Sequence, residues 1–209
     1  MASIKTKQKI LQNARKLFNE KGFVNVTLRD IATASEISIG NLAYHYANKS
    51  VIMRVLYQQM EDVLEEMWAK VNQEPSFANI AQHIQQFHAF QAYYRFFFLD
   101  MLEVERAHPE IAKQHQAHIE RQINNVKSMI DYAVKAGNMQ LELRPGMYAQ
   151  LAHTVWMMIN FWLSQTEIRQ QKSQVDAVEA IWFLVIPHLT TKGSVHLAEL
   201  LPQLSLSKQ

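Results

Sequence analysis

Apolar residues recur at helical spacing along almost the whole chain. In the first segment, Ile10, Leu11, Ala14, Leu17 and Phe18 follow an i, i+1, i+4, i+7, i+8 pattern, which places them on one face of a helix. Glycine favours the residue just after a helix, so Gly22, directly after Lys21, is expected to end this helix after about sixteen residues.

The spacing of apolar residues predicts an all-α chain of nine or ten helices. A short helical unit begins at Thr27 and another at Ser38, and Asn48 or Ser50 caps a fourth helix. Thr27 with Asp30 three residues later resembles a capping box. Further helices are predicted near 76–92, 93–106, 109–136, 146–165 and 174–190, with Pro187 bending or ending the last, and a short helix after Gly193.

Composition agrees with this pattern and excludes several classes of protein. The chain of 209 residues has 5 Gly and 5 Pro, which favours long helices over many tight turns. It has no cysteine, so disulfides, zinc–thiolate sites, iron–sulfur clusters and cysteine nucleophiles are excluded. No apolar run approaches the roughly 20 residues of a membrane span, and the polar N-terminus does not resemble a signal peptide. We therefore expect a cytoplasmic protein without a membrane partner.

Charge is distributed unevenly along the chain. Residues 1–50 contain eight Lys/Arg and three acidic residues, a balance of +5, whereas the remaining 13 basic and 16 acidic residues give −3. A basic N-terminal quarter predicts an anionic partner that meets only this part, with an ordinary solvated surface as the alternative.

The segment 27–46 has the layout of a helix-turn-helix, in which the second short helix enters the major groove of DNA. Asparagine pairs with adenine and isoleucine contacts the thymine methyl, while hydroxyls and free N–H groups at helix starts suit phosphates. Tyr46 is expected to belong to the core. The predicted DNA-binding residues are Thr27, Arg29, Ser38, Ile39, Gly40, Asn41, Tyr44, His45 and Lys49.

Residues 4–64 resemble the TetR/AcrR family of bacterial transcriptional regulators. The matching stretches are residues 14–23 (ARKLFNEKGF), 26–32 (VTLRDIA) and 37–49 (ISIGNLAYHYANK). Two positions depart from the family pattern. Glu36 stands where the family has a turn glycine at a left-handed residue, and Ala43 replaces the first tyrosine of a Tyr-Tyr-His-Phe run.

The resemblance implies a DNA-binding domain at 4–64 and a ligand-binding and dimerisation domain at 65–209. In the family, the last two long helices of each subunit form a four-helix bundle. The helices over 146–165 and 174–190 are apolar nearly all round, which predicts burial on more than one face. Central core helices of a monomer are the alternative. The predicted dimer residues are Met157, Phe161, Trp182 and Phe183.

A dense aromatic stretch in the middle of the chain is a candidate wall for an apolar or aromatic effector. Three consecutive phenylalanines cannot all point one way on a helix, so some are free to line a cavity; ordinary core packing is the alternative. The predicted ligand-binding residues are His88, Tyr93, Phe97, Phe98 and Met101.

Neither a metal nor a cofactor is predicted. His115 and His118 are three residues apart, a spacing that can share a metal, but the sequence shows no third ligand at helical spacing. No nucleophile elbow or Gly-rich phosphate loop is present, so we do not predict an enzyme. We predict a homodimeric repressor that binds double-stranded operator DNA and is released by a small molecule. The alternative is a helical small-molecule-binding protein without operator binding.

Overall fold

The computed structural model describes residues 2–170 and 177–206, which form ten α-helices, one 3₁₀-helix and no strand. The chain divides into two compact units. The first contains Met1–Glu65 and Ala92–His115, and the second contains Glu66–Gln91 and Gln116–Gln209. Helices α4 (Lys49–Gln73) and α7 (Pro109–Lys135) each contribute residues to both units.

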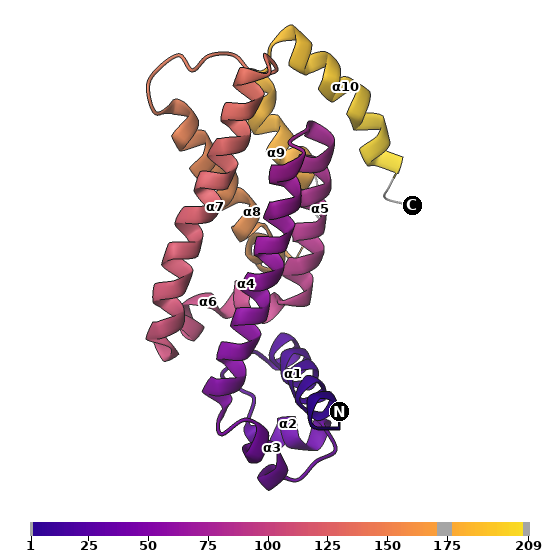
Figure 1. The fold of residues 1–209 in the computed structure, drawn as a ribbon, viewed down its shortest axis with the longest axis vertical. Coiled ribbons are helices and arrows are strands. Elements are labelled where there is room, and N and C mark those ends of the chain that lie inside the picture. Colours follow the sequence, from indigo (N-terminus) through magenta and orange to yellow (C-terminus); the bar gives the residue numbers. More distant parts are fainter. Residues whose placement is uncertain (1, 171–176, 207–209) are drawn as a thin grey trace. The chain divides into compact units, whose positions relative to one another are not determined.

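The first unit is built around three N-terminal helices. Helix α1 (Ala2–Lys21) packs on α2 (Leu28–Ala34), and α2 packs on α3 (Ile39–His45), as Figure 1 shows. The first turns of α4 also contribute buried side chains to this unit. Fully buried core side chains of this unit include Ile10, Phe18, Ile31, Leu42, Ile52 and Leu56. The predicted glycine stop is confirmed: Gly22 has φ +79°, and its N–H donates to the carbonyl of Phe18.

Helix α6 (Arg95–Ala107) belongs to this first unit and packs on α1. Asn19 of α1 joins them, because its amide oxygen accepts from the Phe96 N–H at 3.0 Å and its amide nitrogen donates to the Tyr93 carbonyl at 2.9 Å. Phe96 packs edge-on against Phe18. Asp100 interrupts the helix with non-helical dihedrals and accepts the Phe23 N–H. The unit that holds the helix-turn-helix therefore includes residues beyond the predicted 4–64 segment.

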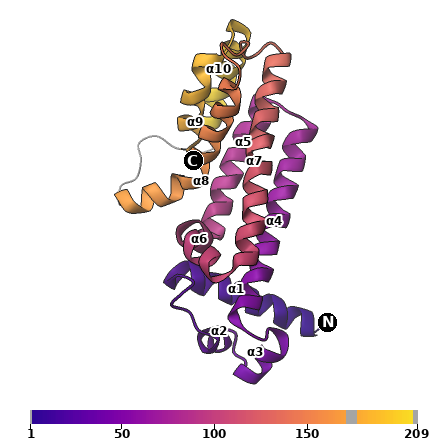
Figure 2. The same ribbon diagram turned by 90° about the vertical axis from the view of Figure 1, so that its left-hand side faces the viewer.

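The second unit is also built from helices. It contains α5 (Phe77–Tyr93), α8 (Met147–Arg169), α9 (Ala177–Val185) and α10 (Thr191–Leu206), with most of α7. Helices α8 and α9 pack side by side (Figures 1 and 2). Helices α5 and α7 contribute side chains to the same core. The core of this unit is formed by residues such as Ile84, Ile130, Val155, Ile181 and Trp182.

A tight corner joins α7, α9 and α10. Helix α9 ends at Val185 and passes into the 3₁₀-helix Ile186–His188, which contains Pro187. Met139 and Leu189 then form an isolated antiparallel bridge. Gly193 is required here by close approach, since a Cβ at this position would lie 2.0 Å from the carbonyl oxygen of Asn138.

The all-α prediction is confirmed. The predicted 76–92, 93–106 and 109–136 helices correspond to α5, α6 and α7, and Asn48 caps α4 by accepting the Val51 N–H. Helix α8 extends four residues beyond the predicted 146–165 boundary. Residues 174–176 of the predicted 174–190 helix lie outside the described residues, and its last turns form the 3₁₀-helix.

Candidate functional site

The start of α2 forms the predicted capping box. The Thr27 hydroxyl oxygen accepts the Asp30 N–H, and the Asp30 carboxylate accepts the Thr27 N–H at 2.8 Å. The hydroxyl of Thr27 also donates to this carboxylate at 2.6 Å, and these hydrogen bonds lower the pKa of Asp30. The capping box stabilises the N-terminus of α2, and Arg29 lies exposed on the first turn of this helix.

The turn between α2 and α3 contains the non-glycine residue in left-handed geometry that the sequence suggested. Glu36 has φ +57°, a conformation in which the Cβ crowds the backbone. Its carboxylate pairs with the Lys9 ammonium, and both side chains are exposed. The hydrogen bond and the charge of Lys9 lower the pKa of Glu36. The negative charge near the turn is thus paired within the chain.

Helix α3 presents one buried side chain and an exposed opposite face. Ser38 caps it, its hydroxyl oxygen accepting the Asn41 N–H at 3.1 Å. Leu42 points into the core and is fully buried. The exposed fraction of Tyr44 is 84% and that of Ile39 is 48%, and Gly40 and Asn41 are exposed as well. Six of the nine predicted DNA-binding residues therefore lie together on this short helix or at its cap.

His45 and Tyr46, at the end of α3, differ in burial. His45 is half-buried, and its ring meets the Tyr44 ring edge-on at 5.2 Å. Tyr46 is 6% exposed, which confirms its predicted place in the core. Burial raises the pKa of the Tyr46 hydroxyl, so it is neutral at physiological pH.

Lys49 has a structural role that the sequence did not reveal. Its ammonium donates to the carbonyl oxygens of Phe23 at 2.8 Å, Val26 at 2.9 Å and Val24 at 3.4 Å. It also lies 4.3 Å above the centre of the Phe23 ring. Desolvation lowers its pKa. All three donors of the ammonium are engaged by the loop that connects α1 to α2, so a phosphate would have to share them.

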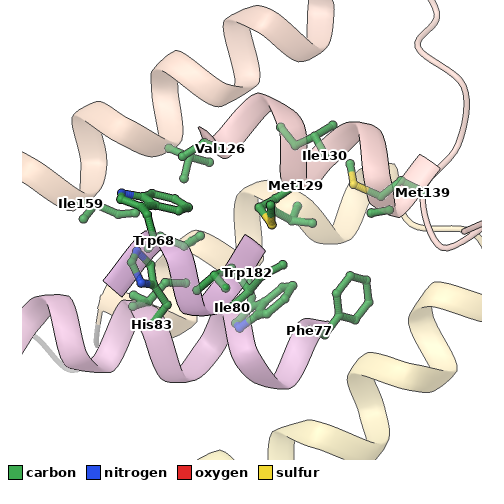
Figure 3. A pocket seen from close by; sticks show the side chains of 16 residues that line it. Trp68, Phe77, Ile80, His83, Val126, Met129, Ile130, Met139, Ile159 and Trp182 are labelled. Carbon is green, nitrogen blue, oxygen red and sulfur yellow. The ribbon is translucent and has the colours of Figure 1, made fainter. Parts of the chain in front are cut away.

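An apolar cavity of about 80 Å³ lies inside the second unit (Figure 3). Its walls come from the end of α4 and from α5, α7, α8 and α9. Trp68 and His83 lie against each other with ring centres 4.3 Å apart, and Phe77 meets Trp182 edge-on at 5.2 Å. Aliphatic and methionine side chains, among them Ile80, Val126, Met129, Ile130, Met139 and Ile159, complete the lining.

The predicted ligand-binding residues lie elsewhere. Phe97 and Phe98 are buried in the first unit, where Phe97 packs against Tyr57 and His115. Tyr93 is exposed, with the Arg15 guanidinium 3.3 Å from its ring centre, and Met101 is half-buried. His88 is exposed on α5. None of these five residues lines the cavity of the second unit, because the aromatic stretch packs into the core of the first.

Sequence reasoning missed the residues that line the cavity, although one signal pointed to them. His83 lies three residues after Ile80 and four before Phe87, so it places a polar ring on the apolar stripe of α5. His83 is 7% exposed, and its Nδ1 has no hydrogen-bond partner among the described residues. Burial lowers the pKa of His83 to about 4.

Three of the four predicted dimer residues are accessible. The exposed fractions are 39% for Met157, 46% for Phe161 and 56% for Phe183. Trp182 requires a correction: it is 3% exposed and buried against Phe77 within its own unit, so it cannot meet a partner subunit. Successive residues on α9 point to different sides, which separates Trp182 from Phe183.

The two histidines at metal-like spacing have other partners. His115 pairs with Glu105 at 2.6 Å, and His118 contacts the amide of Gln122. The described residues contain no group of three or more His, Asp or Glu side chains placed to hold a metal ion. None of the helices in the described ranges has the length and apolarity needed to cross a membrane.

Two protein-family models match consecutive parts of the chain. A model described as "Bacterial transcriptional repressor" matches residues 56–197, and one described as "Bacterial regulatory proteins, tetR family" matches residues 10–56. The chain belongs to the TetR family. This membership agrees with the resemblance found in residues 14–49 and accounts for the helical unit that follows.

Two curated relatives, both named as HTH-type transcriptional regulators, match over short segments. The chain is 32% identical over 56 residues to "Probable HTH-type transcriptional regulator YttP" of Bacillus subtilis. It is 48% identical over 48 residues to the "Biofilm operon icaADBC HTH-type negative transcriptional regulator IcaR" of Staphylococcus epidermidis. The matches cover 27% and 23% of this chain, and about a quarter of each relative's length (27% and 26%).

Solved structures extend the likeness to the whole fold. A TetR-family transcriptional regulator from Marinobacter aquaeolei VT8 superposes with a TM-score of 0.84 at 22% identity, covering 95% of this chain and 98% of that one. At this identity the similarity establishes the fold.

Proposed function

We propose that this TetR-family protein is a sequence-specific DNA-binding repressor that acts as a dimer and releases its operator when a small molecule binds the second unit. The observation that carries the proposal is the exposed face of α3. Ile39, Asn41 and Tyr44 are all exposed there, opposite the buried Leu42, on a helix with the position of a recognition helix.

The types of side chain on this face suit both kinds of DNA contact. The Asn41 amide can pair bidentately with adenine, and the Ile39 side chain suits a thymine methyl. Tyr44 supplies a hydroxyl for a backbone phosphate, and Arg29 on α2 supplies a guanidinium. The negative charge of Glu36 in the turn is paired within the chain, because its carboxylate contacts the Lys9 ammonium.

A dimer follows from the geometry of operator recognition. Two recognition helices read half-sites about one helical turn apart, roughly 34–36 Å. Large apolar side chains exposed on α8 and α9, namely Met157, Phe161 and Phe183, form the surface that we assign to the partner subunit. A ligand that changes the spacing of the two recognition helices would then release the DNA.

Fluorescence anisotropy with a duplex from the region upstream of the protein's own gene tests this proposal. Asn41→Ala should weaken operator binding by about 1–3 kcal/mol, because a bidentate base contact is lost. Binding to a scrambled duplex should change little. The matched control is Asn72→Ala, which removes an exposed asparagine from α4 outside the helix-turn-helix. Equal affinity of wild type and Asn41→Ala for the operator would place base recognition elsewhere.

A further inference from the structure

The cavity of the second unit is lined almost entirely by apolar side chains, and two of its lining residues carry a nitrogen atom without a hydrogen-bond partner. His83 Nδ1 and Trp182 Nε1 both lie buried in its lining residues without a hydrogen-bond partner among the described residues. An unpartnered buried polar atom costs about 1–3 kcal/mol, so a group that supplies the missing hydrogen bond would bind with a clear advantage.

The two nitrogens belong to two aromatic pairs in the cavity wall. Trp68 stacks obliquely on His83, and Phe77 meets Trp182 (Figure 3). The indole N–H of Trp182 can only donate, whereas a neutral imidazole nitrogen can donate or accept. A hydrogen-bond acceptor on the ligand therefore suits both positions, and the flat faces of Trp68 and Phe77 suit an aromatic ring.

The charge of the occupant is restricted as well. None of the other residues described as lining the cavity has an ionisable side chain. His83 is neutral at physiological pH, since its pKa is about 4. An anionic or cationic ligand would lose its hydration without gaining a counter-charge, which is strongly unfavourable.

Size sets the remaining limit. A volume of about 80 Å³ is smaller than that of pockets that hold drug-sized ligands, which are about 300–1,000 Å³. Met129 and Met139 lie in the wall, and the flexible thioether side chain yields to an incoming group more readily than a branched one. A single aromatic ring with a short substituent fits these constraints best.

We propose that this cavity binds a small uncharged aromatic molecule whose carbonyl or similar acceptor is held by Trp182 Nε1 or His83 Nδ1. This proposal rests on the proposed function, because the bound molecule would be the effector. Binding to the cavity is measured in the absence of DNA, so the site is tested separately from operator release.

Three probes of similar shape separate the contributions. Acetophenone carries a neutral acceptor, ethylbenzene has none, and benzoate is anionic. Calorimetric titration of the full chain at pH 7 should show acetophenone binding about tenfold more tightly than ethylbenzene and benzoate not binding. Ethylbenzene binding equally well, benzoate binding as tightly as acetophenone, or no binding of any probe at millimolar concentration would overturn the proposal.

Two variants locate the hydrogen bond. Trp182→Phe and His83→Phe keep an aromatic ring and remove the nitrogen; at least one should reduce the preference for acetophenone over ethylbenzene to near unity. The ¹⁵N–¹H signal of the Trp182 indole, assigned through Trp182→Phe, gives an independent measure in the wild-type protein. Preference retained in both variants would contradict the assigned atoms.

Operator binding is then measured with and without acetophenone. If the probe binds as expected and operator affinity does not change, the proposed release mechanism fails while the site stands. If operator binding is confirmed and the probes do not bind, the site fails while the regulator function stands.

Discussion

The functional polar side chains of the helix-turn-helix face solvent, whereas the polar side chain of the cavity faces the interior of its unit. On α3, Asn41 and Tyr44 face solvent and the apolar Leu42 faces the core. On α5, the polar ring of His83 faces inward, into a wall of aliphatic and aromatic side chains. The first arrangement suits a large, hydrated polyanion; the second suits a small molecule that leaves water behind.

This difference determines how each region constrains its partner. A surface contact to DNA is made in competition with water and salt, so its specificity depends on geometry and its affinity on many contacts. A buried contact has no water to replace it, so one unpartnered nitrogen selects for an acceptor strongly. Substitutions at the apolar surface of α8 and α9, at His83, at Lys49 and at Glu36 test this contrast.

The largest effect is expected at the exposed apolar surface of α8 and α9. Met157→Glu combined with Phe183→Glu places two charges on the assigned dimer surface and should give a monomer by light scattering at micromolar concentration. Operator affinity should fall by about 10²–10⁴-fold, because the second half-site is no longer held nearby. The control is Gln150→Glu, an exposed substitution near the start of α8. A monomeric wild type would disprove the assignment.

The second effect concerns the buried ring in the cavity. His83 has a pKa of about 4 in the folded protein, against 6.5 for a free imidazole. As pH falls below 6.5 the unfolded chain takes up the proton first, so stability present above pH 6.5 is lost progressively until about pH 4. The full loss is about 3 kcal/mol. Below pH 4 the folded protein is protonated too and the loss levels off.

Urea unfolding between pH 7.5 and 4 measures this loss. Other groups titrate in the same range, so the informative quantity is the difference between wild type and His83→Phe. The variant should lack about 3 kcal/mol of the pH-dependent change. Parallel curves for the two proteins would show that His83 is not held neutral by burial.

The sequence was most informative where chemistry depends on local geometry. The caps at Thr27 and Ser38, the stop at Gly22 and the inward position of Leu42 could all be predicted from spacing, because each depends on residues within one turn. The sequence also indicated left-handed geometry at Glu36, through the family pattern that places glycine there.

The rest depended on contacts between distant segments. The sequence of Phe96–Phe98 was compatible with a cavity wall and with a core, and the packing of these residues on α1 and α4 decides for the core. Trp182 and Phe183 are adjacent and both apolar, so hydropathy could not distinguish the buried one from the exposed one. The residues that line the cavity lie between positions 68 and 185 and come mainly from five helices. No local sequence pattern predicts that residues so far apart meet.

A third, smaller effect separates two roles of Lys49. Lys49→Met keeps the apolar stem and removes the ammonium that holds three carbonyls of the α1–α2 loop. We expect a loss of about 1–2 kcal/mol in the free energy of unfolding. If the lysine serves only this loop, the slope of log K against log salt for operator binding stays unchanged. If Lys49 also contacts a phosphate, the substitution lowers the slope by about one in addition to the loss of stability.

The smallest effect is expected at the turn of the helix-turn-helix, where Glu36→Gly tests whether the departure from the family pattern is strained. Glycine adopts φ +57° without steric cost, so the substitution should raise the melting temperature by about 1–3 °C. It also removes the partner of Lys9, which leaves an additional free positive charge near the turn and should tighten binding to any duplex at low salt. Glu36→Gln keeps the strained backbone and removes only the charge. It should reproduce the gain in DNA affinity without the gain in melting temperature, and equal melting temperatures for Glu36→Gly and Glu36→Gln would show that the left-handed residue is not under strain.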